Sequence, residues 1–159
     1  MQENSYIQVL IQSLHQKVEA LDSIIEKNKE QYEILSAEEA DMEAFDQNVR
    51  EKSEFIDKII FLDDGFQEIY ARVKEELDAN KQSHAEEIRQ MKELIAKITE
   101  RSMKVQAQEQ RNKELAGMQF SKARKKIRQV KAGSKVASQY YQSMQQLNVV
   151  DPQFMDKKK

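Results

Sequence analysis

The stretch IQVLIQSLHQKVEALDSII, residues 7–25, decides the fold of this 159-residue chain. Along one row its apolar residues recur at alternating steps of four and three, which is the repeat of one face of an α-helix. Comparable rows continue almost to Leu147. The one proline, Pro152, lies beyond the last row, and only three glycines, at 65, 117 and 133, interrupt the chain. We therefore predict an all-α protein built from long amphipathic helices.

The composition favours an elongated bundle over a compact globule. Charged residues make up 34% of the chain, whereas Leu, Ile, Val and Phe together number 37 of 159. Long paired helices need only a narrow apolar seam and tolerate charge at the remaining positions. The predicted architecture is an elongated antiparallel helical hairpin or three-helix coiled-coil-like bundle, with a basic C-terminal helix and a short tail.

Three long helices are expected, at about residues 5–36, 40–79 and 83–131. They would form one unit over residues 1–131, followed by a basic and aromatic C-terminal helix and flexible tail over residues 132–159. Ser36 with Glu39 predicts a capping box and Asp41 is a second N-cap candidate, so a turn is expected within residues 36–41. Because neither glycine nor proline interrupts that stretch, a continuous rod stays open. A phase slip after Leu77, with a Ser83 capping box, predicts a second turn near residues 79–83.

Charge divides the chain into two chemically different parts. Residues 1–114 hold 26 acidic and 16 basic residues, whereas residues 115–159 hold 2 acidic and 10 basic ones. The basic run is either a solvated face that balances the acidic helices or a contact for an acidic partner or an anionic membrane. No nucleic-acid-binding motif is present, and we expect no nucleic-acid partner. Small residues such as Ala123 disfavour a helix lying on a membrane.

The sequence shows none of the residue patterns of catalytic or metal sites. There is no cysteine, and neither His15 nor His84 has a second ligand at a convincing spacing. Adjacent carboxylates such as Asp63 and Asp64 point about 100° apart on a helix, and we expect them to face water. Phosphate loops and nucleophile elbows are absent. We predict that the chain is not an enzyme and binds neither cofactor nor metal.

Cellular location is constrained mainly by what the N-terminus and the apolar rows lack. Residues 1–6 are polar, and no window approaches eighteen apolar residues in succession. A secretion signal and an integral membrane segment are therefore not expected, and the cytoplasm is the predicted compartment.

The aromatic residues fall into two groups. One group lies at helical spacing and is expected in the core: Phe45, Phe55, Phe61 and Phe66. The other lies in the basic part of the chain, where the apolar face has no evident partner within the molecule: Phe120, Tyr140, Tyr141 and Phe154. For this second group, packing within the chain and contact with another protein both remain open.

Two stretches resemble the FlgN class of flagellar type III export chaperones, with the FliT-like chaperones close behind. Residues 41–45, DMEAF, followed by Val49, the pair Glu51-Lys52 and an apolar row, are similar to the opening of that family's second helix. Residues 109–115, EQRNKEL, are similar to its late N-x-x-N-x-x-L element. Asn112 and Leu115 match that element outright, whereas Glu109 stands where the family has Asn. The resemblance spans roughly residues 5–130.

The resemblance implies a cytoplasmic, non-enzymatic chaperone. Such a protein holds the C-terminal amphipathic helix of a hook-associated or filament-cap protein, prevents premature assembly and delivers its substrate to the type III export apparatus. The residues expected to contact the substrate helix are Val105, Asn112, Leu115, Phe120, Ile127 and Val130. Candidates for docking on the export apparatus are Lys125, Lys126, Arg128, Tyr140 and Tyr141.

A structural coiled coil is the alternative interpretation. In that case the chain would be a homodimeric spacer or scaffold whose seam is completed by its own copy and whose basic segment docks on an acidic partner. Composition supports this alternative equally well, and a homodimer remains open.

Overall fold

A computed structural model describes residues 2–126 and 139 of the chain. It contains three helices, α1 (Gln2–Ser36), α2 (Met42–Ala79) and α3 (Ala85–Lys126). The predicted all-α bundle is confirmed. The expected continuation of the third helix to residue 131 lies outside the described residues. So does the expected C-terminal unit, residues 132–159, except for Gln139.

The connection between α1 and α2, residues 37–41, is defined by a side-chain cap. Asp41 Oδ1 accepts hydrogen bonds from the backbone N–H groups of Glu43 at 3.1 Å and Ala44 at 3.2 Å. These bonds satisfy two of the donors that a helix leaves without partners at its N-terminus. The Ser36 hydroxyl instead donates to the carbonyl of Tyr32 at 2.6 Å. Asp41 is therefore the cap, and the chain turns here rather than continuing as one rod.

The second connection, residues 80–84, ends at His84. The carbonyl of His84 accepts a hydrogen bond from the Ile88 N–H at 2.9 Å, so the first turn of α3 starts from this residue. Glu86, which we expected to form a capping box with Ser83, accepts a hydrogen bond from Arg89 Nε at 3.0 Å. His84 is buried and lies 3.2 Å from the Glu76 carboxylate, which joins the end of α2 to the start of α3.

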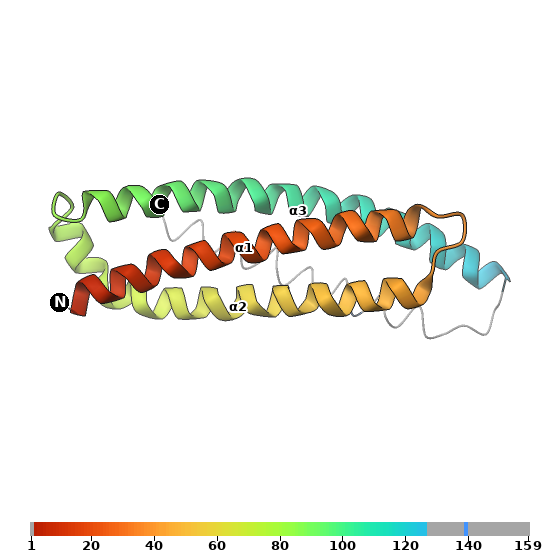
Figure 1. Cartoon of the computed structure of the whole chain (residues 1–159), viewed down its shortest axis with the longest axis horizontal. Coiled ribbons are helices and arrows are strands. Elements are labelled where there is room, and N and C mark those ends of the chain that lie inside the picture. Colours follow the sequence, from red (N-terminus) through yellow and green to blue (C-terminus); the bar gives the residue numbers. More distant parts are fainter. Residues whose placement is uncertain (1, 127–138, 140–159) are drawn as a thin grey trace.

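Helix α1 lies between the other two helices along the length of the molecule (Figure 1). It is antiparallel to α2 and parallel to α3. Because α1 packs against two neighbours, its apolar stripe is wider than a simple two-helix seam. Its buried side chains include Ile7, Leu10, Ile11, Leu14, Leu21, Ile24 and Ile25. At about 1.5 Å per residue, the helices span roughly 50–60 Å, so the two ends of the bundle are separate regions.

Candidate partner-binding surfaces

Much of the row expected to contact a substrate helix is buried inside the chain's own bundle. Val105 and Asn112 are each 1% exposed, and Phe120 is 8% exposed. The ring of Phe120 meets that of Phe45 edge-on, with centroids 5.9 Å apart, and Leu115 is partly buried against the same core. From the sequence alone, no other part of the chain could be assigned to cover this row. In the structure, α1 and α2 cover it. Ile127 and Val130 lie outside the described residues.

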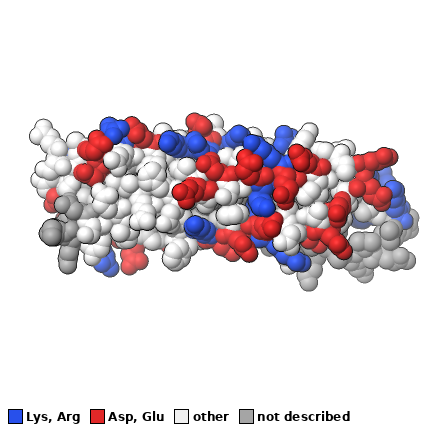
Figure 2. Space-filling model, in the orientation of Figure 1, with Lys and Arg blue, Asp and Glu red and all other residues white. Residues whose placement is uncertain are grey.

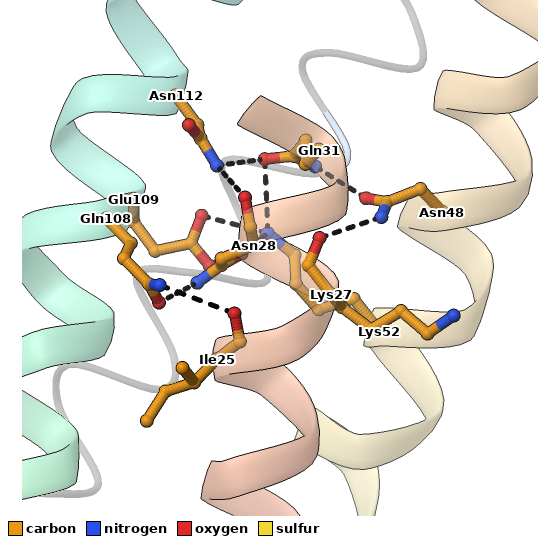
Figure 3. Close-up of polar contacts among 9 residues, drawn as sticks. All are labelled: Ile25, Lys27, Asn28, Gln31, Asn48, Lys52, Gln108, Glu109 and Asn112. Carbon is orange, nitrogen blue, oxygen red and sulfur yellow. Dashed lines mark hydrogen bonds and ion pairs between the residues drawn. The ribbon is translucent and has the colours of Figure 1, made fainter. Parts of the chain in front are cut away.

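A buried polar layer crosses the bundle and joins all three helices (Figure 3). Lys52 of α2 donates to both carboxylate oxygens of Glu109 in α3, at 2.8 and 2.9 Å. The same ammonium group donates to Asn28 Oδ1 of α1 at 2.8 Å. Asn28 in turn donates to Gln108 Oε1 at 3.1 Å. The layer therefore connects α2 and α3 through an ion pair and ties both to α1 through amides.

Burial governs the electrostatics of this layer. The Lys52 side chain is fully buried, and the Glu109 side chain is 10% exposed. Removal from water lowers the pKa of Lys52 to about 8, while the neighbouring Glu109 carboxylate opposes that shift. Lys52 is therefore still protonated at pH 7. Removing either partner alone would leave a charge in the interior without its counter-charge, which is costly. The ion pair therefore helps to hold α3 against α2.

Three amide side chains of α3 set its register on α1. Gln108, Asn112 and Gln119 donate to the backbone carbonyls of residues 25, 28 and 35, at 3.3, 3.0 and 3.0 Å. The offset between the partners stays at 83 or 84 residues, as two parallel helices require. Gln119 also donates to the Ala37 carbonyl at 2.7 Å and so satisfies acceptors at the C-terminus of α1. A one-turn slip of α3 would break all of these bonds.

A second buried ion pair joins α1 to α2. Lys17 donates to the two carboxylate oxygens of Asp63 at 2.9 and 3.0 Å, and both side chains are almost fully buried. The expectation that Asp63 faces water was therefore wrong, although its neighbour Asp64 is exposed. In the sequence, Lys17 and Asp63 each lie next to a position of an apolar row. That placement was the signal that could have predicted their burial.

The core prediction for the phenylalanines is wrong at one position. Phe45 and Phe66 are buried and Phe55 is partly buried, but Phe61 is 76% exposed. Phe61 comes two residues after Ile59, which is fully buried, so the two side chains lie about 200° apart around α2. A helical-wheel argument from Ile59 would have found this exposed aromatic ring.

The end of α3 carries the predicted docking residues that the structure describes. Lys125 and Lys126 are exposed in the last turn of α3. Lys126 lies 4.0 Å from Glu39, and Lys122 donates to the Glu38 carbonyl at 3.4 Å, so α3 passes beside the α1–α2 connection. Arg128, Tyr140 and Tyr141 lie outside the described residues. Lys125 and Lys126 are thus presented at the end of the molecule that holds the α1–α2 connection.

The described residues offer surfaces for protein contacts. Within residues 2–126, no group of three His, Cys, Asp or Glu side chains is placed to hold a metal ion. None of the helices described is long and apolar enough to cross a membrane. The fold that these residues form is an all-helical bundle of three long helices.

Comparison with known proteins identifies the family. The model of the FlgN protein family matches residues 1–148. The chain therefore belongs to the FlgN family, and its general role is that of a flagellar export chaperone. This is a family of chaperones, not of enzymes. Neither the curated proteins nor the solved structures contain a significant match to the chain.

Proposed function

We propose that this chain is a cytoplasmic chaperone for hook-associated or filament-cap proteins. It binds the C-terminal amphipathic helix of its substrate, prevents premature assembly and delivers the substrate to the type III export apparatus. Membership of the FlgN family is the observation that carries this proposal. The family match continues through residues 127–148, beyond the last described turn of α3.

The substrate helix is proposed to bind at the C-terminal end of α3 and along the row that follows it in the sequence. Among residues 2–126, Phe120 is the last α3 residue in the buried core. The apolar row continues in the sequence as Ile127 and Val130, at the helical steps of seven and three residues. A partner helix would contact these two residues and the edge of Leu115. Val105 and Asn112 would support the site from inside the bundle, by holding α3 against α1.

The basic end of α3 is proposed to make a separate contact with the export apparatus. The region from Leu115 to Val150 contains no acidic residue, whereas the first 114 residues are acidic overall. An acidic partner surface would therefore be attracted to this end of the molecule and not to its flanks. The proposed contacts are Lys125, Lys126, Arg128, Tyr140 and Tyr141.

Light scattering of the full chain with and without a substrate peptide tests the first contact. Peptides from the C-terminal helices of hook-associated proteins are expected to form one-to-one complexes. The double variant Ile127→Asp/Val130→Asp should lose the complex, because it places two charges in an apolar contact. Met103→Asp is the matched control, because Met103 is a 66% exposed apolar residue elsewhere on α3. Unchanged peptide affinity in the double variant would refute the proposed site.

Charge reversal tests the division between the two contacts. Lys125→Glu/Lys126→Glu/Arg128→Glu should keep peptide binding and weaken binding to the purified export apparatus component, more strongly at low salt. Equal loss of both interactions would show that the basic end does not act separately from the substrate site.

A further inference from the structure

Gly65 lies in the interior of α2, where the chain's own fold gives no reason for a glycine. A glycine inside a helix costs about 1 kcal/mol relative to alanine. The residue is helical, and a Cβ atom built on it meets no described atom within 4 Å. Neither a close internal contact nor an unusual backbone conformation therefore explains it. The missing side chain leaves open space at the surface between α1 and α2.

That space is an apolar hollow of about 260 Å³ between the two helices. Its lining includes Val9 and Ser13 of α1, and Phe61, Gly65, Phe66 and Ile69 of α2. Phe61 is 76% exposed and Val9 is 44% exposed, so apolar groups project beside the hollow. An apolar cavity of roughly 150 Å³ is already large enough to hold benzene. A phenylalanine ring from another molecule would fit.

The surface around the hollow on α1 carries no charge. Residues 4–16 contain no Asp, Glu, Lys or Arg, in a chain that is 34% charged. The next charged pair, Lys17 and Asp63, is buried and mutually neutralised. Figure 2 shows uncharged side chains gathered over the left half of the visible face, where the N-terminal half of α1 lies. Depletion of charge around exposed aromatic residues is the compositional sign of a protein interface.

We propose that this face binds a second copy of the same chain, with Phe61 of each copy entering the hollow beside Gly65 of the other. A two-fold symmetric contact requires one patch that is complementary to itself. Here the projecting ring and the receiving hollow belong to the same patch.

Electrostatics favours a second copy at this face in particular. The first 114 residues hold 26 acidic and 16 basic residues, so a contact between the charged flanks of two copies brings like charges together. The uncharged α1 side of the face reduces that repulsion at the centre of the contact, where Asp64, next to Gly65 on α2, is exposed. At its edge, Glu68 and Arg72 are exposed charges of opposite sign, as a self-complementary rim requires. This inference does not rest on the proposed chaperone function, because the dimer face and the end of α3 are different surfaces.

Light scattering and sedimentation of the full chain, over micromolar to near-millimolar concentrations, test the proposal. The wild-type mass should rise from 18.7 kDa toward twice that value as concentration increases. Phe61→Glu and Gly65→Leu should each weaken dimerisation at least tenfold, the first by introducing charge and the second by filling the hollow. Gly117→Leu and Met103→Glu are matched controls, since Gly117 also has open space and Met103 is exposed. Both controls should dimerise as the wild type does.

Three results would overturn the proposal. A wild-type mass of 18.7 kDa at every concentration would exclude the second copy as occupant. Unchanged dimerisation of both hollow variants, with helical content preserved, would place the dimer contact elsewhere. Loss of substrate-peptide binding in Phe61→Glu and Gly65→Leu, but not in their controls, would assign the hollow to the substrate. Failure of the Ile127→Asp/Val130→Asp test would leave the dimer proposal unaffected.

Discussion

Glu109→Gln is the substitution that most directly tests how α3 is held in the bundle. Its carboxylate accepts two hydrogen bonds from Lys52, whose side chain is fully buried. The amide keeps the shape of the side chain but removes the charge that compensates Lys52. Removing one partner of a buried ion pair typically costs about 3–5 kcal/mol. Because the pKa of Lys52 is only about 8 even beside Glu109, Lys52 can release its proton in this variant, and we expect a smaller loss in the free energy of unfolding, about 1–3 kcal/mol at pH 7, out of a total of about 5–15 kcal/mol.

A double-mutant cycle separates the ion pair from general damage to the core. Lys52→Met removes the buried charge but leaves Glu109 without its partner, so this single variant should also be destabilised. The double variant Lys52→Met/Glu109→Gln leaves neither charge uncompensated, and should be less destabilised than the sum of the two single variants by at least about 1 kcal/mol. Some loss should remain, because Asn28 Oδ1 no longer receives its hydrogen bond from Lys52.

Urea unfolding followed by circular dichroism measures these differences. The control is the pair formed by Arg101 and Asp22, whose side chains are 27% and 52% exposed at an N–O distance of 3.1 Å. Asp22→Asn should change stability by no more than about 1 kcal/mol, because water already screens that pair. A Glu109→Gln variant as stable as the wild type would refute the argument, since the Glu109 carboxylate would then contribute nothing to holding Lys52 and α3 together.

Three further predictions concern stability. Burial lowers the pKa of Lys52 to about 8, so above that pH the unfolded chain keeps a proton that the native chain has released, and the free energy of unfolding rises with pH. Between pH 8 and 10.5 the wild type should gain up to about 3 kcal/mol relative to Lys52→Met. Urea unfolding at each pH measures this difference. Asp41→Ala should cost about 1 kcal/mol through loss of the α2 cap, whereas Ser36→Ala should cost clearly less; equal effects would reject Asp41 as the cap. Gly65→Ala should raise stability by up to about 1 kcal/mol, because a methyl group meets no described atom there, and a lower melting temperature would contradict the open space at this position.

Asn112 and Phe61 show which structural features could be predicted from the sequence and which could not. Both lie in helices that periodicity predicts. Periodicity assigned Asn112 to an apolar row but could not say whether α1 or a foreign helix covers that row, because a seam residue looks the same in both cases. Phe61 was assigned to the core from its spacing alone. The apolar residues of α2 extend around more of the helix than the face that α1 covers, and Phe61 lies outside that face.

The sequence by itself determined the helical class, the placement of two reversals within a few residues, and the resemblance to the FlgN family. These follow from local physics: side-chain period, capping residues and the absence of internal proline act within a few turns of the chain. Only the tertiary structure decided that Lys52 pairs with Glu109, that Lys17 pairs with Asp63, and that a hollow stays open beside Gly65. Those outcomes depend on which helix lies between the other two and in which register, and partners separated by 46 and 57 residues leave no periodic signal.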